Sequence, residues 1–122
     1  MARGKKFSWR SRAMSLRYAV EGVIKFFSTE HNARIHLVAT VLVIIISIVF
    51  PVSNTEAIAL AIVTGLVWSA ELFNTAIERM ADRISLDRDH AIKYIKDISA
   101  AAVLVMAIIA VITAGIIFIP KL

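Results

Sequence analysis

The feature that most constrains this chain is the run from Ile98 to Ile119, which carries no charged residue. A helix needs roughly 20 mainly apolar residues to cross a bilayer, and this run is long enough. Two further apolar stretches precede it, at 35–50 and 55–70. Hydrophobic residues make up 59% of the 122 residues, more than a small water-soluble domain can cover with polar surface. We therefore predict an all-α integral membrane fold with three transmembrane helices in a single domain, 1–122.

Polar and turn residues divide the chain into segments. Leu16, Val20 and Ile24 recur at helical spacing, while Arg17 and Glu21 lie on another face, which is typical of an amphipathic helix. This helix suits the membrane surface, packing on its own subunit, or both. Turn-forming residues follow the first span, and Pro120 follows the third. We predict a basic leader at 1–11, a surface helix at 12–29, and membrane helices at 30–50, 55–82 and 91–119.

The positive charge is distributed unevenly along the chain. The formal net charge is +5, and Lys and Arg gather before the first span and between Arg79 and Lys96, whereas the turn between the first two spans has none. This pattern indicates binding to anionic headgroups and no nucleic acid partner. Because positive residues favour the cytoplasmic side, we predict a cytoplasmic N-terminus and an outside C-terminus.

Four polar residues of the second span share one helix face. Glu71, Asn74, Glu78 and Asp82 occupy positions i, i+3, i+7 and i+11. An ionisable group in a span costs a few kcal/mol and normally faces a cavity, a partner or an ion, so the pattern predicts a functional site. The structural alternative pairs Glu71 with Lys96 or Arg34 and treats the remaining acids as headgroup-level charges.

Further polar residues are expected at the same side of the membrane. Carboxylates there supply oxygen ligands for Mg²⁺, and Lys or Arg neutralises phosphate, so the set fits phosphoryl transfer. Neither a Gly-rich phosphate loop nor a kinase catalytic loop is present, and the absence of cysteine excludes thiolate chemistry. A proton or cation pathway is also compatible with these residues, although the charges are confined to the cytoplasmic half of the membrane spans. The residues are Glu30, Asn32, Arg34 and His36 before the first span, and Lys93, Lys96 and Asp97 before the third.

The string Glu71-Leu72-Phe73-Asn74-Thr75-Ala76-Ile77-Glu78, followed by Asp82 and by Lys96-Asp97, resembles the prokaryotic diacylglycerol kinase family, which includes undecaprenol kinases. The resemblance runs from about Leu16 to the C-terminus. It implies a homotrimer in the bacterial inner membrane, with active sites between subunits. It further implies phosphorylation of a lipid alcohol with ATP and Mg²⁺, with diacylglycerol placed before undecaprenol.

The resemblance also implies roles for individual residues. Glu71 is the expected general base on the lipid hydroxyl, and Asn74, Arg34 and Asp82 orient groups in the site. Glu30 and Glu78 are expected to bind Mg²⁺ with its ATP. The remaining nucleotide contacts implied are Tyr18, Lys96 and Asp97, together with Arg10 or Arg12, which flank Ser11 where the family has an arginine.

Several residues have simpler interpretations or leave alternatives open. We expect Trp68 and Phe73 to serve helix packing. The three histidines, His31, His36 and His90, lack metal-ligand spacing. We expect them to be polar residues at the mouth of the membrane helices, that is, at their cytoplasmic ends. Asp87 or Asp89 stands where the family often has a residue near the nucleotide. A small proton or cation transporter and a non-catalytic assembly subunit are the rival functions.

Overall fold

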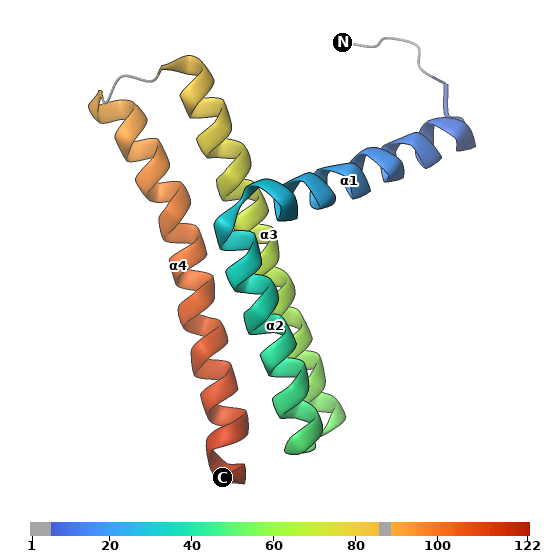
Figure 1. Cartoon of the computed structure of the whole chain (residues 1–122), viewed down its shortest axis with the longest axis vertical. Coiled ribbons are helices and arrows are strands. Elements are labelled where there is room, and N and C mark those ends of the chain that lie inside the picture. The colour runs from blue at the N-terminus through green and yellow to red at the C-terminus, as the bar shows by residue number, and fades with distance from the viewer. Residues whose placement is uncertain (1–5, 86–88) are drawn as a thin grey trace. The chain divides into compact units, whose positions relative to one another are not determined.

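The computed structural model describes residues 6–85 and 89–122. They form four α-helices and a final 3₁₀ turn, and no strand occurs among them, which confirms the all-α prediction. Figure 1 shows the helices in chain order. The elements are α1 (Trp9–Thr29), α2 (His31–Val49), α3 (Asn54–Ile84), α4 (His90–Phe118) and η1 (Ile119–Lys121).

The helix ends follow local capping chemistry. The Ser8 hydroxyl accepts a hydrogen bond from the Ser11 amide (3.0 Å), so α1 begins at Trp9. The predicted leader at 1–11 was therefore too long, because the cap makes its last three residues helical. Ser53 and Glu56 form a reciprocal capping box at the start of α3. Asp89 caps α4 by accepting from the Ile92 amide (2.9 Å), a structural role for one of the two connector acids; the other, Asp87, lies outside the described residues.

The breaks between elements differ slightly from the predicted ones. Glu30 has an extended backbone and separates α1 from α2, so the first span begins at His31. Pro120 follows α4, as expected, and lies in η1, because a 3₁₀ turn accepts a proline at its start. The contacts divide the chain into two units, Met1–Arg34 and Ile35–Leu122.

Within the first unit, α1 exposes a row of apolar side chains, with Leu16, Val20 and Ile24 all at least half exposed. Arg17 and Glu21 form an ion pair one turn apart (3.0 Å) on the polar side. At the C-terminal end of α1, Arg34 donates to the carbonyl oxygens of Phe27 (3.5 Å) and Ser28 (3.2 Å). The arginine thus satisfies acceptors that the helix end leaves free. The surface location of α1 stays a prediction.

Within the second unit, α3 and α4 pack antiparallel over their whole length (Figure 1). Lys121 pairs with Glu56 (3.1 Å) at one end, and Lys96 pairs with Asp82 near the other. The small core between the helices includes Leu60, Val67 and Ile117. α2 is joined to α3 by side-chain hydrogen bonds described below.

Three helices are long and apolar enough to cross a membrane: His31–Val49, Asn54–Ile84 and His90–Lys121. Only 17% of the apolar window of α3, and 6% of each of the others, is buried inside the chain. Burial of such apolar surface is worth about 25 cal/mol per Å², so these faces require lipid or protein neighbours. This is the arrangement of an integral membrane protein.

Candidate active site

The polar face of α3 is the centre of the candidate site. Its four predicted residues lie on one continuous helix, yet they do not share one environment. Glu71 contacts α2, whereas Asn74 and Asp82 contact α4. The stripe therefore lies along α3 between the side that contacts α2 and the side that contacts α4.

Glu71 is the most deeply buried member, with 2% of the residue exposed. Its Oε2 atom lies 3.2 Å from Nε2 of His36, and the His36 side chain is 20% exposed. The structural alternative that pairs Glu71 with Lys96 is wrong, because both residues have other partners. The pairing with Arg34, which lies in the other unit of the chain, stays a prediction. Lys96 is bound to Asp82, and Arg34 to the carbonyl oxygens at the end of α1.

Asn74 is fixed from the opposite helix. The Ser99 hydroxyl donates to its Oδ1 atom at 2.6 Å, and both residues are buried. Because the amide oxygen is occupied, the amide NH₂ is the group left to donate to a ligand. The orienting role expected for Asn74 stays a prediction, and the structure adds its partner Ser99, which helical spacing on α3 alone did not reveal.

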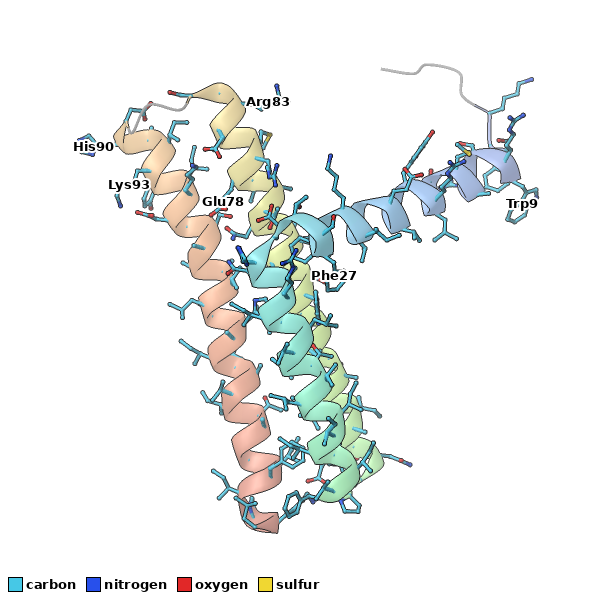
Figure 2. The ribbon with its side chains drawn as sticks, in the orientation of Figure 1. Trp9, Phe27, Glu78, Arg83, His90 and Lys93 are labelled. Atoms are coloured by element: carbon cyan, nitrogen blue, oxygen red, sulfur yellow. The ribbon has the colours of Figure 1, made fainter. Side chains whose placement is uncertain are left out.

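Glu78 lies between these two contacts. It is one turn from Asn74 and one turn from Asp82, both of which bond to α4, so it lies on the side of α3 that faces α4 (Figure 2). The residue is half-buried, and its carboxylate has no hydrogen-bond or ion-pair partner among residues 6–85 and 89–122. It is therefore an acceptor available to a ligand.

The two adjacent residues expected at the nucleotide differ in their surroundings. Lys96 is paired with Asp82, and both side chains keep partial access to solvent. Asp97, one position further along α4, is bound to Lys93 at 2.6 Å in an exposed pair one helical turn apart. Lys96 thus belongs to the α3–α4 contact, while Asp97 belongs to the outer surface of α4.

The other predicted site residues lie in the first unit. Tyr18 is 61% exposed on α1, and Arg10 is exposed near its start. Arg12 lies over the Phe7 ring, 5.3 Å from its centroid. Glu30 lies between α1 and α2, where it caps the end of α1. Their participation in the site stays a prediction.

The donor chemistry fits Mg²⁺ bound together with a nucleotide. Among the described residues no three acidic or histidine side chains gather into a metal-binding group. A dedicated protein cage is not required, however, because Mg²⁺ is usually held by one or two carboxylates plus substrate phosphates and water. The unpaired carboxylate of Glu78 is suited to that arrangement.

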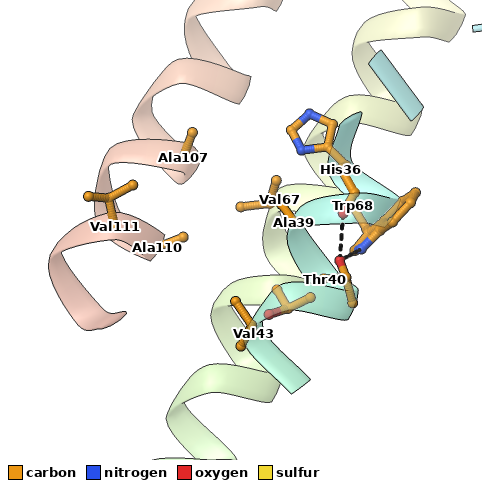
Figure 3. Close-up of a pocket in the computed structure, with 10 residues that line it drawn as sticks. His36, Ala39, Thr40, Val43, Val67, Trp68, Ala107, Ala110 and Val111 are labelled. Atoms are coloured by element: carbon orange, nitrogen blue, oxygen red, sulfur yellow. Dashed lines mark hydrogen bonds between the residues drawn. The ribbon is translucent and has the colours of Figure 1, made fainter. Parts of the chain in front are cut away.

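An apolar cavity of about 170 Å³ adjoins this region (Figure 3). All three helices of the second unit line it, including His36 and Thr40 from α2, Trp68 from α3 and Ala107 from α4. Trp68 donates its indole N–H to the Thr40 hydroxyl at 3.0 Å. Trp68 thus packs between helices, as expected, and also makes a hydrogen bond. Phe73 was expected to pack as well, but 70% of it is exposed, so it does not pack against another helix of the second unit.

Sequence reasoning placed His36 at the mouth but missed its contact with Glu71. Periodicity relates residues of one helix, whereas this pair joins α2 to α3 across 35 positions. The available signal was a lone titratable residue within an otherwise apolar span, which needs a polar partner at its own depth.

The chain is similar to known proteins along most of its length. The profile of the prokaryotic diacylglycerol kinase family matches residues 17–118. A diacylglycerol kinase of Synechocystis sp. is 38% identical over 110 residues, which cover 89% of this chain and 63% of that protein. An undecaprenol kinase of Bacillus subtilis is 37% identical over 106 residues, covering 86% and 85% of the two chains. A diacylglycerol kinase of Pseudomonas aeruginosa is 33% identical over 85 residues, or 70% and 69%. The chain therefore belongs to the prokaryotic diacylglycerol kinase family, whose named relatives are lipid kinases.

Proposed function

We propose that this protein transfers the γ-phosphoryl group of ATP to the primary hydroxyl of a membrane lipid. The observation that carries the proposal is the buried carboxylate of Glu71 in an apolar span, with the polar residues Glu78, Asp82 and Lys96 toward one end of the same helices. A lipid hydroxyl and a nucleotide meet where apolar and polar surroundings meet. Family membership supports the same chemistry.

In the proposed reaction, Glu71 accepts the proton of the lipid hydroxyl as its oxygen attacks the γ-phosphorus. A new O–P bond forms, the bond from the γ-phosphorus to the bridging oxygen breaks, and ADP leaves. Asn74 orients the reacting groups through its free amide NH₂. Glu78 and Glu30 would hold the Mg²⁺ that accompanies ATP, which would supply neutralisation of the phosphate charge.

Further nucleotide contacts are proposed for residues at the polar end. Lys96 is partly accessible beside Asp82, so it can turn toward a phosphate while Asp82 keeps it oriented. The proposed nucleotide site is completed by Tyr18, Asp97, and Arg10 or Arg12. Arg34, which donates to carbonyl oxygens at the end of α1, is proposed to orient groups in the site. We propose a homotrimer in the bacterial inner membrane, with a cytoplasmic N-terminus and an outside C-terminus.

Two lipids are candidates for the alcohol. Diacylglycerol is the first candidate substrate, and two relatives are named diacylglycerol kinases. Undecaprenol is the second candidate, because a relative that is 37% identical over 86% of this chain is named an undecaprenol kinase. Both lipids offer one primary hydroxyl on a long apolar body.

The rival transport function requires a relay of polar groups across the membrane. A second charged cluster does exist at the opposite end, where Glu56 pairs with Lys121. On α3, however, no charged residue occurs between Glu56 and Glu71. Fifteen residues of helix separate them by roughly 22 Å at 1.5 Å per residue, which is too far for proton transfer. This gap favours catalysis at one surface over conduction.

The decisive test uses purified protein in mixed micelles with γ-labelled ATP and Mg²⁺, and diacylglycerol or undecaprenol as acceptor. We expect label in the lipid fraction, dependent on both Mg²⁺ and one of the lipids. The faster of the two lipids identifies the preferred substrate. Protein that transfers no label to either lipid, while retaining its helical circular dichroism, contradicts the proposal.

A further inference from the structure

The unassigned residue with the strongest link to the proposed site is His36. Among the described residues, it is the partner that satisfies the buried Glu71 carboxylate, through the 3.2 Å contact from Nε2 to Oε2. The Glu71 side chain is 3% exposed, so solvent does little to orient or solvate it. A buried carboxylate without a partner is costly, and a hydrogen bond to a charged group is stronger than one between neutral groups.

A second contact between α2 and α3 lies one helical turn from the imidazole. One turn further along α2, the Thr40 hydroxyl donates to the His36 carbonyl oxygen (2.7 Å) and accepts from the Trp68 indole (3.0 Å). Trp68 lies three residues before Glu71 on α3, and its ring centroid is 6.1 Å from that of His36 (Figure 3). The ring's own hydrogen bond is to Glu71, on the same face of α3 as Trp68, while the Thr40 bonds join α2 to α3 without touching the ring.

We infer that His36 is a positioning residue that donates its Nε2–H to Oε2 of Glu71 and thereby presents Oε1 to the lipid hydroxyl. The inference rests on the proposed function, in which Glu71 accepts the hydroxyl proton. One carboxylate oxygen is then occupied by a donor and the other is left as the base. His36 acts through Glu71 and does not itself touch the reacting atoms.

A kinetic test separates this role from a structural one. His36→Leu removes the donor, and we expect kcat for lipid phosphorylation to fall about tenfold or more with KM for Mg-ATP unchanged. His36→Gln places an amide N–H at a similar reach and should recover most of that loss. Thr40→Val is the matched control, because it breaks the Trp68 contact between α2 and α3 but leaves the His36–Glu71 pair. It should keep kcat within about twofold of the parent protein.

The coupling between the two residues gives a second criterion. In a Glu71→Gln background, adding His36→Leu should lower kcat no further, because the base that His36 positions is already absent. Additive losses overturn the inference, as does a normal kcat in His36→Leu or an equal loss in Thr40→Val. A parent protein inactive on both lipids contradicts the proposed function instead.

A readout independent of turnover keeps the inference testable in that case. In ¹⁵N-histidine-labelled protein, the His36 signals are assigned by their loss in His36→Gln, since only two other histidines occur in the chain. We expect the neutral ring to carry its proton on Nε2, with that nitrogen's shift changed by Glu71→Gln. A proton on Nδ1, or shifts that ignore Glu71→Gln, overturns the assignment.

Discussion

At the scale of single residues, Glu71 and Glu78 show how one helix face can hold two carboxylates with different tasks. They lie about two turns apart on α3. Glu71 is almost fully buried and bound to His36, while Glu78 is half-buried and unpaired among the described residues. A positioned, water-shielded oxygen suits proton transfer from a hydroxyl, and an open carboxylate suits a hydrated cation.

We predict that Glu71→Gln and Glu78→Gln fail in different ways. Loss of the base should lower kcat by roughly 10²–10⁴ with near-normal Mg-ATP binding. Loss of the metal-binding carboxylate should also weaken nucleotide binding and raise the Mg²⁺ concentration needed for half-maximal rate. Magnesium titrations of turnover and of nucleotide binding measure both effects. The reverse pattern exchanges the two roles, and unimpaired turnover in both variants removes the proposed site.

The same residues show where prediction from the sequence ends. Spacing of 3.6 residues per turn placed Glu71, Asn74, Glu78 and Asp82 on one face, because those positions depend on a single helix. Their partners His36, Ser99 and Lys96 lie on other helices. Side-chain pairs between helices depend on axial register and rotation, which no periodicity in one segment specifies.

At the scale of elements, the helices could be predicted more completely than their ends. Apolar runs determine which segments cross a membrane, and all three spans were found. The start of α1 was missed because it depends on one hydroxyl, that of Ser8, which outweighs the lack of apolar periodicity in the residues after it. The capping box of Ser53 and Glu56 acts in the same way at α3.

We predict that this capping box stabilises the protein without contributing to catalysis. Ser53→Ala should lower the free energy of unfolding by about 1 kcal/mol, because the Glu56 amide loses its acceptor. Turnover should be unchanged, since Glu71 lies more than four helical turns away along α3. Thermal unfolding in detergent measures the effect.

Ser47→Ala is the matched control for that substitution. Its hydroxyl donates only to the Val43 carbonyl of its own helix (2.7 Å), so its loss should change stability by less than about 0.5 kcal/mol. Equal effects of the two substitutions contradict a special role for the cap, and reduced turnover in Ser53→Ala contradicts its separation from the site.

At the scale of the whole molecule, one chain offers little enclosure. Its apolar spans are mostly exposed, and the proposed metal ligands Glu30 and Glu78 belong to different units of the chain. A symmetric oligomer covers apolar faces and lets each copy contribute residues to a neighbour's site. A homotrimer with sites between subunits is the arrangement that we propose on this basis together with the family resemblance.

Mixing two inactive variants tests whether sites are shared. Glu30→Gln and Glu71→Gln should each abolish turnover alone. If Glu30 of one subunit serves a site whose Glu71 belongs to its neighbour, random mixing of equal amounts gives roughly a quarter of the sites both native carboxylates. Co-expressed or dissociated and reassembled mixtures should then recover about that fraction of the parent rate. If both residues of a site come from one chain, every site keeps one defect and no activity returns. A mixture of Glu71→Gln with Glu71→Ala is the control and should stay inactive, because neither chain supplies a base.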